Sequence, residues 1–554
     1  MNKLIKHLLL FAAFLSFCNS IFAQKDKGGG KKIGKGFTVE WGPDIKMKGL
    51  FPTEMLLYDK GSFYVSIVVP KAFSAAEYNL VKINDKLDIV LQNRIKTEEE
   101  DKKASYNHER GVMEVGDDMY VFEEEKVHHD KKINYYLEKV DKNTCAPAGN
   151  KKLIYSVDYS VDKDRQDDDV SIYADNESKF LAIYDQHKVD RKENAECTIR
   201  VLNSGFEKMW EKNITLPLIA TRGGTGDFRR YIDPSSNYYL VSKVYKDDKR
   251  NSKEVKEGEL NYDYHIYMMG ENIKTYIDYP FHLKDKAVSQ VRLNVKKKGD
   301  LVATGIYADV ISEKNKVSIP KGIFFTTIDM EHATIKSQSY KEFGTEVFTA
   351  GLKDKQAEKE EKRIEKGKDV GFDFIIHDLI NRKDGGSTMI AEEFRLEIVT
   401  YSNGRTTYTR YFYKFRNIII AKISATGEIG WVSVIAKNQV MEGSDAACSY
   451  LLFDHDNDTY HVFFNEHRDN LSAAGPKGGG LKVMDNLKKA ILVSVEVGAD
   501  GSIGKKNEVV KLPPDDEKTH FYPKLSFIPE NENDIILFGT EKSHEKFAKI
   551  HFDK

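Results

Sequence analysis

The three tryptophans of the chain share one local pattern, which constrains the fold more than any other feature. An isoleucine follows each of them four residues later, in the pairs Trp41 and Ile45, Trp210 and Ile214, and Trp431 and Ile435. A weaker copy places Leu91 before Ile95. Side chains an even number of residues apart point to the same face of a strand, so every copy presents the same face for packing. A turn-and-strand element that recurs at long intervals indicates a repeat architecture.

A second recurring element is a polar turn that leads into an aromatic or branched strand, as expected of a β-hairpin. It occurs at intervals of roughly 55 to 85 residues, a little longer than common propeller repeats. The eight turns are Lys60-Gly61-Ser62, Gly116-Asp117-Asp118, Asn176-Glu177-Ser178, Ser235-Ser236-Asn237, Lys298-Gly299-Asp300, Asp384-Gly385-Gly386, Asp456-Asn457-Asp458 and Glu532-Asn533-Asp534. They predict eight repeated units.

Each unit has room for four strands. The third strand is apolar, as in residues 418–423 and 490–495, and the fourth carries the tryptophan position. The last unit, from Tyr522 to Phe552, has room for only three strands, whereas Phe37 to Ile45 is a lone fourth strand at the start. This arrangement resembles the β-propeller superfamily, in which four-stranded antiparallel sheets repeat around an axis.

The sequence therefore predicts an all-β fold with a single β-propeller over residues 37–554. We expect eight blades of four antiparallel strands, closed by pairing of the N-terminal strand with the last blade. Seven blades, two smaller propellers or two β-sandwich domains are the alternatives. Lys353 to Lys368 interrupts the pattern, so we expect a charged insertion, either a helix or a loop, at about residues 351–370.

The first residues have the pattern of a secretory signal. Lys3 and Lys6 precede an apolar run, and Ala23 is a small residue at the expected cleavage point, so residues 1–23 are predicted to be a signal peptide. Residues 24–36, rich in glycine and lysine, are expected to form a flexible linker. The composition resembles that of exported proteins of Bacteroidota, and we expect a periplasmic, cell-surface or extracellular protein without a transmembrane segment.

Composition argues against several classes of function. The formal charge of the full chain is −2, and it becomes about −4 without the signal peptide, so we expect no nucleic-acid partner. Three cysteines remain, Cys145, Cys197 and Cys448, too few and too widely spaced for a disulfide framework or a metal cluster. The acidic run from Asp454 to Asp458 is interpreted as a hairpin turn, with a calcium loop as the alternative.

No familiar catalytic motif is present, and we expect no cofactor and no metal. Ser424 to Trp431 is distantly similar to the docking repeats of quinoprotein propellers, and that likeness implies structure rather than a quinone. The segment from Phe394 to Phe415, rich in tyrosine and arginine, is interpreted as a long β-ribbon that offers an interaction surface.

Alignment of the units brings chemically active side chains to equivalent places after the second strand. The candidate ligand-binding residues are Asp185, His187, Arg222, Arg229, Glu466 and His467. Carboxylates, imidazoles and guanidinium groups at one mouth of a propeller channel would bind a polar or anionic ligand through charge-assisted hydrogen bonds. Strand bracing by these same residues is the structural alternative.

We expect a binding or interaction module for a protein or glycan in the cell envelope, and not an enzyme. The first alternative is a carbohydrate-active enzyme, a glycoside hydrolase or lyase, with Glu392, Glu393 and Glu466 as its catalytic carboxylates. The second alternative is a structural subunit of an envelope complex. Fold likeness alone does not decide among them, because propellers carry many activities.

Overall fold

A computed structural model describes residues 32–552 with gaps. The undescribed residues in that range are 35–36, 46–50, 70–76, 96–109, 128, 159–169, 175–178, 188–192, 220–228, 247–254, 257–258, 284–285, 296–299, 312–315, 330–331, 333, 367–371, 403–406, 456–457, 472–479, 510–519, 530–532 and 542–543. The predicted signal peptide, the first part of the predicted linker, Arg222 and the centre of the acidic run therefore lie outside the described residues.

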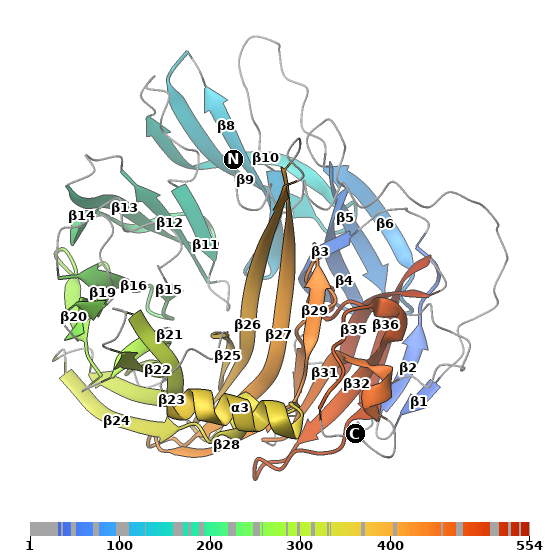
Figure 1. Ribbon diagram of the computed structural model, residues 1–554. Helices are drawn as coiled ribbons and strands as arrows, with labels where there is room; N and C mark the ends of the chain where they lie inside the picture. The colour runs from blue at the N-terminus through green and yellow to red at the C-terminus, as the bar shows by residue number, and fades with distance from the viewer. Residues whose placement is uncertain are drawn as a thin grey trace. The chain divides into compact units, whose positions relative to one another are not determined.

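The described residues form two compact units, and each is described by itself. The first contains residues from 51 to 246 and from 261 to 282, and the second contains those from 32 to 45, from 255 to 260 and from 283 to 552. Figure 1 shows that antiparallel sheets make up nearly all of both units.

The first unit contains four sheets of four antiparallel strands. Their strands are β3 (Phe51–Asp59), β4 (Ser62–Val69), β5 (Glu77–Asn84) and β6 (Ile89–Ile95); β7 (Arg110–Val115), β8 (Asp118–Val127), β9 (Lys132–Asp141) and β10 (Ala146–Asp158); β11 (Val170–Ala174), β12 (Phe180–Gln186), β13 (Asn194–Asn203) and β14 (Lys208–Ile219); and β15 (Arg229–Ile232), β16 (Tyr238–Tyr245), β19 (Tyr262–Met269) and β20 (Ile277–Phe281).

The second unit contains four more sheets. Their strands are β21 (Ala287–Val295), β22 (Leu301–Ile311), β23 (Lys316–Asp329) and β24 (Thr334–Glu342); β25 (Asp373–Asn381), β26 (Ser387–Ser402), β27 (Thr407–Ile423), β28 (Ile429–Ile435) and β29 (Gln439–Glu442); β30 (Leu451–Asp454), β31 (Tyr460–His467), β32 (Ala490–Val497) and β33 (Asn507–Glu508); and β34 (His520–Phe521), β35 (Asp534–Glu541) and β36 (His544–Phe552), joined by β2 (Phe37–Trp41) and β1 (Lys32–Gly34). A separate short pair is formed by β17 (Val255–Lys256) and β18 (Glu259–Leu260).

Eight antiparallel sheets, seven built from strands that lie close together in sequence and one that also includes the N-terminal strands, confirm the predicted all-β propeller fold. The N-terminal strand also takes its predicted place, because β2 pairs with β36 in the register Val39 to Ile550. Lys32–Gly34, within the expected linker, adds one more strand outside β2. The extent of a single domain over residues 37–554 stays a prediction.

The tryptophans occupy the fourth strand of their sheets, as predicted, and Trp210 and Trp431 each form a hydrogen bond to the next sheet. The indole nitrogen of Trp210 donates to the carbonyl of Ser236 at 3.0 Å, and that of Trp431 to the carbonyl of Ala499 at 3.1 Å. Trp41 stacks on Phe521 at 5.5 Å. The Trp41 contact lies within one sheet, so the repeat marks a contact between neighbouring sheets at Trp210 and Trp431.

The turn before the tryptophan strand β14 and the turn before its weaker copy β6 share one hydrogen-bonded structure. Asn203 Oδ1 accepts from the backbone N–H groups of Gly205 and Glu207, and Phe206 adopts a left-handed backbone with φ of 59°. Asn84 makes the same bonds in the β5–β6 turn, where Leu87 has φ of 66°. An Asx side chain that mimics a backbone turn explains why this short sequence recurs.

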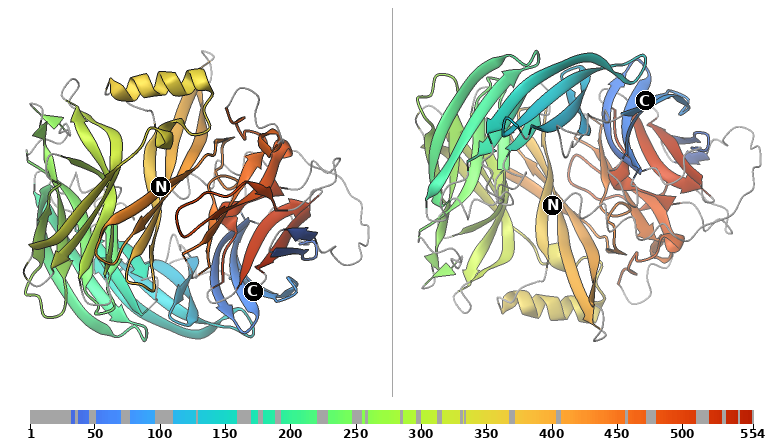
Figure 2. Two further views of the ribbon diagram at one scale, coloured as in Figure 1. Left: turned by 90° about the horizontal axis from the view of Figure 1, so that it is seen from below. Right: turned by 90° about the horizontal axis from the view of Figure 1, so that it is seen from above.

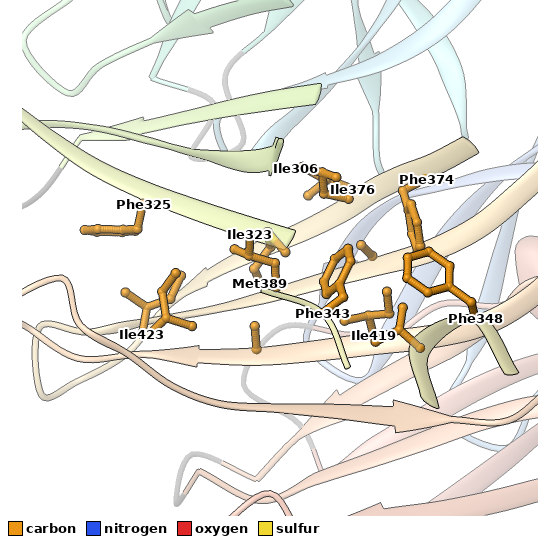
Figure 3. Packing of buried hydrophobic residues seen from close by; sticks show 14 of the residues in the cluster. Ile306, Ile323, Phe325, Phe343, Phe348, Phe374, Ile376, Met389, Ile419 and Ile423 are labelled. Atoms are coloured by element: carbon orange, nitrogen blue, oxygen red, sulfur yellow. The ribbon is translucent and has the colours of Figure 1, made fainter. Parts of the chain in front are cut away.

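Hydrophobic side chains fill the spaces between neighbouring sheets. Figure 3 shows one such cluster, in which Ile323 and Phe325 of β23 pack with Met389 and Ile419 of the next sheet. Phe348 of the short helix α2 (Glu346–Thr349) joins the same cluster. The charged insertion contains a second helix, α3 (Asp354–Glu365), whose Ile364 packs against this core.

Three short 3-10 helices complete the described elements, η2 (Arg468–Leu471), η3 (Leu487–Lys489) and η4 (Pro523–Leu525). Within the described residues no helix is both long and apolar enough to cross a membrane.

Candidate functional site

A cavity of about 400 Å³ opens in the second unit between β25, β30 and the segment after η4. We call it the β25–β30 cavity. Its polar lining consists of His377, Asp378, Ser449, Tyr450 and Asp454. Its apolar lining consists of Ile380, Leu451, Leu452 and Ile528. A concave site with apolar walls and a few convergent polar groups is the common form of a small-ligand pocket.

A β-bulge aims two consecutive side chains into this cavity. The register of β25 with β26 shifts between Ile376 and Asp378, so His377 is the extra residue of the bulge. In a regular strand, neighbouring side chains point to opposite faces. The bulge removes that alternation, and both His377 and Asp378 line the cavity.

Glu392 of β26 is the centre of a buried polar network behind the cavity. One carboxylate oxygen accepts hydrogen bonds from Ser449 Oγ at 2.6 Å and from His377 Nε2 at 3.1 Å. The other pairs with the ammonium of Lys437, and both of these residues are fully buried. Burial opposes ionisation of Glu392, but Lys437 and His377 hold its pKa below the usual value. Its carboxylate is therefore ionised and already paired.

The loop before β30 holds Ser449 in a strained conformation. Its φ is 65°, in the left-handed region that non-glycine residues rarely adopt. The backbone N–H of Ser449 donates to Gln439 Oε1 at 2.8 Å, and the same oxygen accepts from Lys437 at 2.8 Å. The buried network therefore fixes both the backbone and the hydroxyl of Ser449, which shapes the cavity wall.

Asp378 is the most accessible carboxylate of this region. The hydroxyl of Tyr450 donates to Asp378 Oδ2 at 3.2 Å, and the ring of His377 lies edge-on to the ring of Tyr450 at 5.4 Å. The side chain of Asp378 is exposed at the cavity. The surrounding cavity walls still remove part of its hydration, and this desolvation raises the pKa of its carboxyl above the ordinary value. Tyr450 has a pKa well above its usual range because it is buried beside that carboxyl.

The other two carboxylates of the enzymatic alternative are also buried and paired. Glu393 lies 3.6 Å from Arg416 Nε and accepts from the backbone N–H of Asn417 at 3.3 Å. Burial raises the pKa of Glu393 to about 7. Glu466 pairs with Lys506 at 2.5 Å. Neither lines the β25–β30 cavity among the described residues, so the structure gives no support to these three glutamates as an accessible acid and base.

His467 is buried against its own sheet. Its Nδ1 accepts from the backbone N–H of Asp469 at 3.2 Å, and Glu466 accepts from Asn470 Nδ2 at 2.7 Å. These contacts favour bracing of the β31–η2 connection over capture of a ligand.

Two of the predicted residues, Asp185 and His187, are close to each other in the first unit. His187 Nε2 lies 2.7 Å from the hydroxyl of Thr198 and 4.0 Å from Asp185 Oδ2. Asp185 is buried and also accepts from the hydroxyl of Tyr155 at 2.9 Å. Arg229 is the first residue of β15, and its side chain is not among those that the structure describes. That these residues share one rim with Glu466 and His467 stays a prediction.

Sequence reasoning missed most residues that form the cavity. It selected Glu392 but not His377, Lys437 or Ser449, which contact it from other strands and loops. Lone residues of these types carry no motif, and the β-bulge has no sequence signature at this place. Within the described residues, no group of three or more His, Cys, Asp or Glu side chains has the spacing of a metal site.

The predicted ribbon is a long hairpin of β26 and β27, clear in Figures 1 and 2 as a pair of strands longer than their neighbours. β25 pairs with β26 only as far as Phe394, and β29 pairs with β27 only over Phe412 to Phe415. Among the described residues, no strand pairs with the outer edge of β26 from Arg395 to Ser402. We call residues 395–402 and 407–411 the hairpin extension.

The two faces of the hairpin extension differ in charge. One face carries Leu396, Ile398, Thr400 and Ser402 of β26 with Tyr411, Thr409 and Thr407 of β27, and no charged residue. Leu396 is 37% and Ile398 56% exposed. The other face carries Arg395, Glu397 and Arg410 together with a stacked pair, Tyr401 and Tyr408, at 5.1 Å.

Comparisons with known proteins give no family: no known sequence family and no curated protein matches the chain. Among solved structures it is similar to the WD40 domain of SCAP from fission yeast, with 7% identity and a TM-score of 0.35 over 94% of this chain and 95% of that one. The β-propeller domain of the Trilobed protease from Pyrococcus furiosus aligns at 9% identity and a TM-score of 0.30, over 72% of this chain and 100% of that one. An ulvan lyase, a polysaccharide lyase, aligns at 8% identity and a TM-score of 0.32, over 92% and 96%. These similarities lend no activity to this chain, and the fold assignment rests on its own sheets.

Proposed function

We propose that this protein is a binding module that holds a protein partner along the hairpin extension, after export to the cell envelope. The observation that carries the proposal is the edge of β26 that no described strand covers, beside the exposed Leu396 and Ile398. An uncovered strand edge offers unpaired backbone N–H and C=O groups to a strand of another chain.

The neutral face favours a protein over a glycan as the partner. It is a stripe of aliphatic, aromatic and threonine side chains without a charge or an amide. A strand added beside β26 would form backbone hydrogen bonds, and its alternate side chains would pack next to Leu396 and Ile398. Glycan recognition commonly uses carboxylate, amide and guanidinium groups, and the only polar groups of this stripe are hydroxyls.

The opposite face supplies a rigid aromatic anchor. Arg410 lies over the rings of both Tyr401 and Tyr408, at 5.4 and 5.6 Å from their centroids. Arginine stacked on tyrosine loses little conformational freedom on binding, and both residue types are enriched where interfaces bind most strongly.

The test places a photo-crosslinking amino acid at Ile398 and, as a matched control, at Ile335, which is 47% exposed on the edge strand β24. The crosslinked envelope protein is identified and purified, and its affinity is then measured for Ile398→Lys and Ile335→Lys. We expect Ile398→Lys to weaken binding by about tenfold or more, and Ile335→Lys to leave it unchanged. Equal affinity of both variants and wild type would refute the proposal.

Backbone pairing has its own test in Thr400→Pro, because proline cannot donate a ladder hydrogen bond. Thr400 lies on the exposed part of β26, so the fold should persist while partner binding falls. Export is tested separately by mass spectrometry of the protein from the envelope fraction, which should begin at Gln24.

A further inference from the structure

We propose that the β25–β30 cavity binds a small organic cation, an ammonium group attached to a compact apolar body. This inference is independent of the proposed protein partner, because it concerns a different part of the second unit. The cavity, of about 400 Å³, is within the size range of small-molecule sites.

The charge of the lining selects a cation. Asp378 and Asp454 contribute carboxylates, and no lysine or arginine belongs to the described residues of the lining. Lys437 lies behind the wall and is committed to Glu392 and Gln439. An anionic ligand would therefore meet two carboxylates, with no lysine or arginine among the described lining residues to pair with.

Asp378 is the group placed to receive the ammonium. The Tyr450 hydroxyl is the one hydrogen-bond donor that reaches its carboxylate from the described part of the chain, which leaves Oδ1 to accept from a ligand. Arg292, whose charge acts on Asp378, donates through two nitrogens to the carbonyl oxygen of Ile376, at 3.1 and 2.8 Å. A carboxylate in a concave site with an incomplete hydrogen-bond shell gains a charge-assisted bond when an ammonium enters.

The apolar wall selects the rest of the ligand. Ile380, Leu451, Leu452 and Ile528 are all partly buried and belong to the cavity lining. Water against these side chains is released when an apolar group covers them. Four branched side chains offer a broad surface, which suits a ring or a branched group better than a linear chain.

The buried network keeps this geometry in place before any ligand binds. His377 Nε2 and Ser449 Oγ both donate to the same oxygen of Glu392, so neither side chain is free to rotate. A cavity with fixed walls loses little conformational entropy on binding.

The experiment uses the mature chain, residues 24–554, and isothermal titration calorimetry with 2-phenylethylammonium and its neutral analogue 2-phenylethanol. We expect the ammonium to bind at least about tenfold more tightly than the alcohol, because only the ammonium pairs with Asp378. Asp378→Asn should remove that preference, whereas Asp485→Asn, an exposed carboxylate outside the cavity, should keep it.

The pH provides a second readout, which a merely structural role of Asp378 would not move. The pKa of Asp378 is raised above its ordinary value. As the pH is lowered through that pKa, the carboxylate becomes protonated and the affinity for the ammonium should fall, while the affinity for the alcohol stays constant. The charged and titratable groups around Asp378 are His377, Tyr450 and Arg292, and Asp454 lines the same cavity. The comparison between wild type and Asp378→Asn separates its titration from theirs.

Equal binding of the alcohol and the ammonium, an unchanged preference in Asp378→Asn, or no binding of either probe would overturn the proposal. Should Asp378→Asn fail to fold, Ile380→Trp tests the same site by filling the cavity, and it should abolish ammonium binding. Retention of binding in that variant would also overturn the proposal.

Discussion

Val39, near the start of the chain, pairs in antiparallel register with Ile550, near its end. Both side chains are completely buried. The N-terminal strand β2 is thus an integral part of the last sheet and lies between β1 and β36. It contributes Phe37 and Val39 to the hydrophobic core.

Loss of core contact on β2 should destabilise the protein strongly. Phe37 is 2% exposed and lies edge-on to Phe463 and Phe552, at 6.2 and 5.9 Å. We expect Phe37→Ala to lower the free energy of unfolding by about 3–5 kcal/mol in urea denaturation, since it opens a cavity in a packed core. Thr38→Ala, on the other face of the same strand, should cost less than about 1 kcal/mol. A loss below 1 kcal/mol for Phe37→Ala would mean that the strand is dispensable.

The ion pair of Lys437 and Glu392 should behave as a unit. Lys437→Met leaves a buried carboxylate without its cation, and we expect a loss of about 3–5 kcal/mol. The double variant with Glu392→Gln removes both charges and should recover a large part of that loss. Lys362→Met, which breaks the exposed pair with Glu358 on α3, should leave the free energy of unfolding nearly unchanged, because water screens that pair. Additive losses in the double variant would contradict a coupled pair.

The repeat could be predicted from sequence because its cause is local. The turn around Asn203 is held by hydrogen bonds within a few residues, and Trp210 contacts the turn that follows in the chain. A similar short sequence therefore forms a similar structure in each repeat. The missing fourth strand of the last sheet was predicted correctly for the same reason, because Trp41 carries the marker of a fourth strand. Strand alternation and turn chemistry contain that information.

The cavity could not be predicted because its cause is not local. His377 reaches Glu392 through a β-bulge, and Ser449 reaches it from a loop whose φ is unusual for serine. The enzymatic alternative named Glu392 as a catalytic carboxylate, whereas the fold buries it against Lys437 from a later segment. Burial and pairing of charges depend on which sheets become neighbours, and a single sequence does not contain that information.

The histidine pair of β30–β31 should make stability fall at acid pH. His455 Nε2 lies 2.6 Å from His461 Nδ1, and burial lowers the pKa of His461 from 6.5 to about 4. The folded state favours the neutral ring, so its stabilisation is complete above pH 6.5 and is lost as the pH falls toward 4. We expect a loss of roughly 2 kcal/mol, less than the full shift implies because the ring is partly exposed.

His461→Gln removes this titration and isolates its contribution. The difference in unfolding free energy between wild type and His461→Gln should shrink between pH 7 and pH 4, as measured by urea titrations at several pH values. His544→Gln changes an exposed histidine and should leave the pH profile of wild type unchanged. A pH-independent difference for His461→Gln would show that the ring does not resist protonation.

Glu393 should give the opposite dependence on pH. Burial raises the pKa of its carboxyl from 4.5 to about 7, so the folded state binds a proton that the unfolded state has released. The stabilisation is complete below pH 4.5 and is lost as the pH rises to about 7. Glu393→Gln keeps the shape of the protonated side chain and cannot ionise. Relative to wild type it should gain roughly 3 kcal/mol of stability between pH 4.5 and pH 8.

The sign of this change distinguishes burial from pairing as the dominant influence on Glu393. Arg416 lies 3.6 Å away and favours the ionised form, so removal of the charge also removes an attraction. Were that attraction stronger than the cost of burial, Glu393→Gln would lose stability relative to wild type as the pH rises. Glu397 is on the same strand as Glu393 and forms a more exposed salt bridge with Lys414 of β27. Glu397→Gln serves as the control, and its free energy of unfolding should change by less than about 1 kcal/mol.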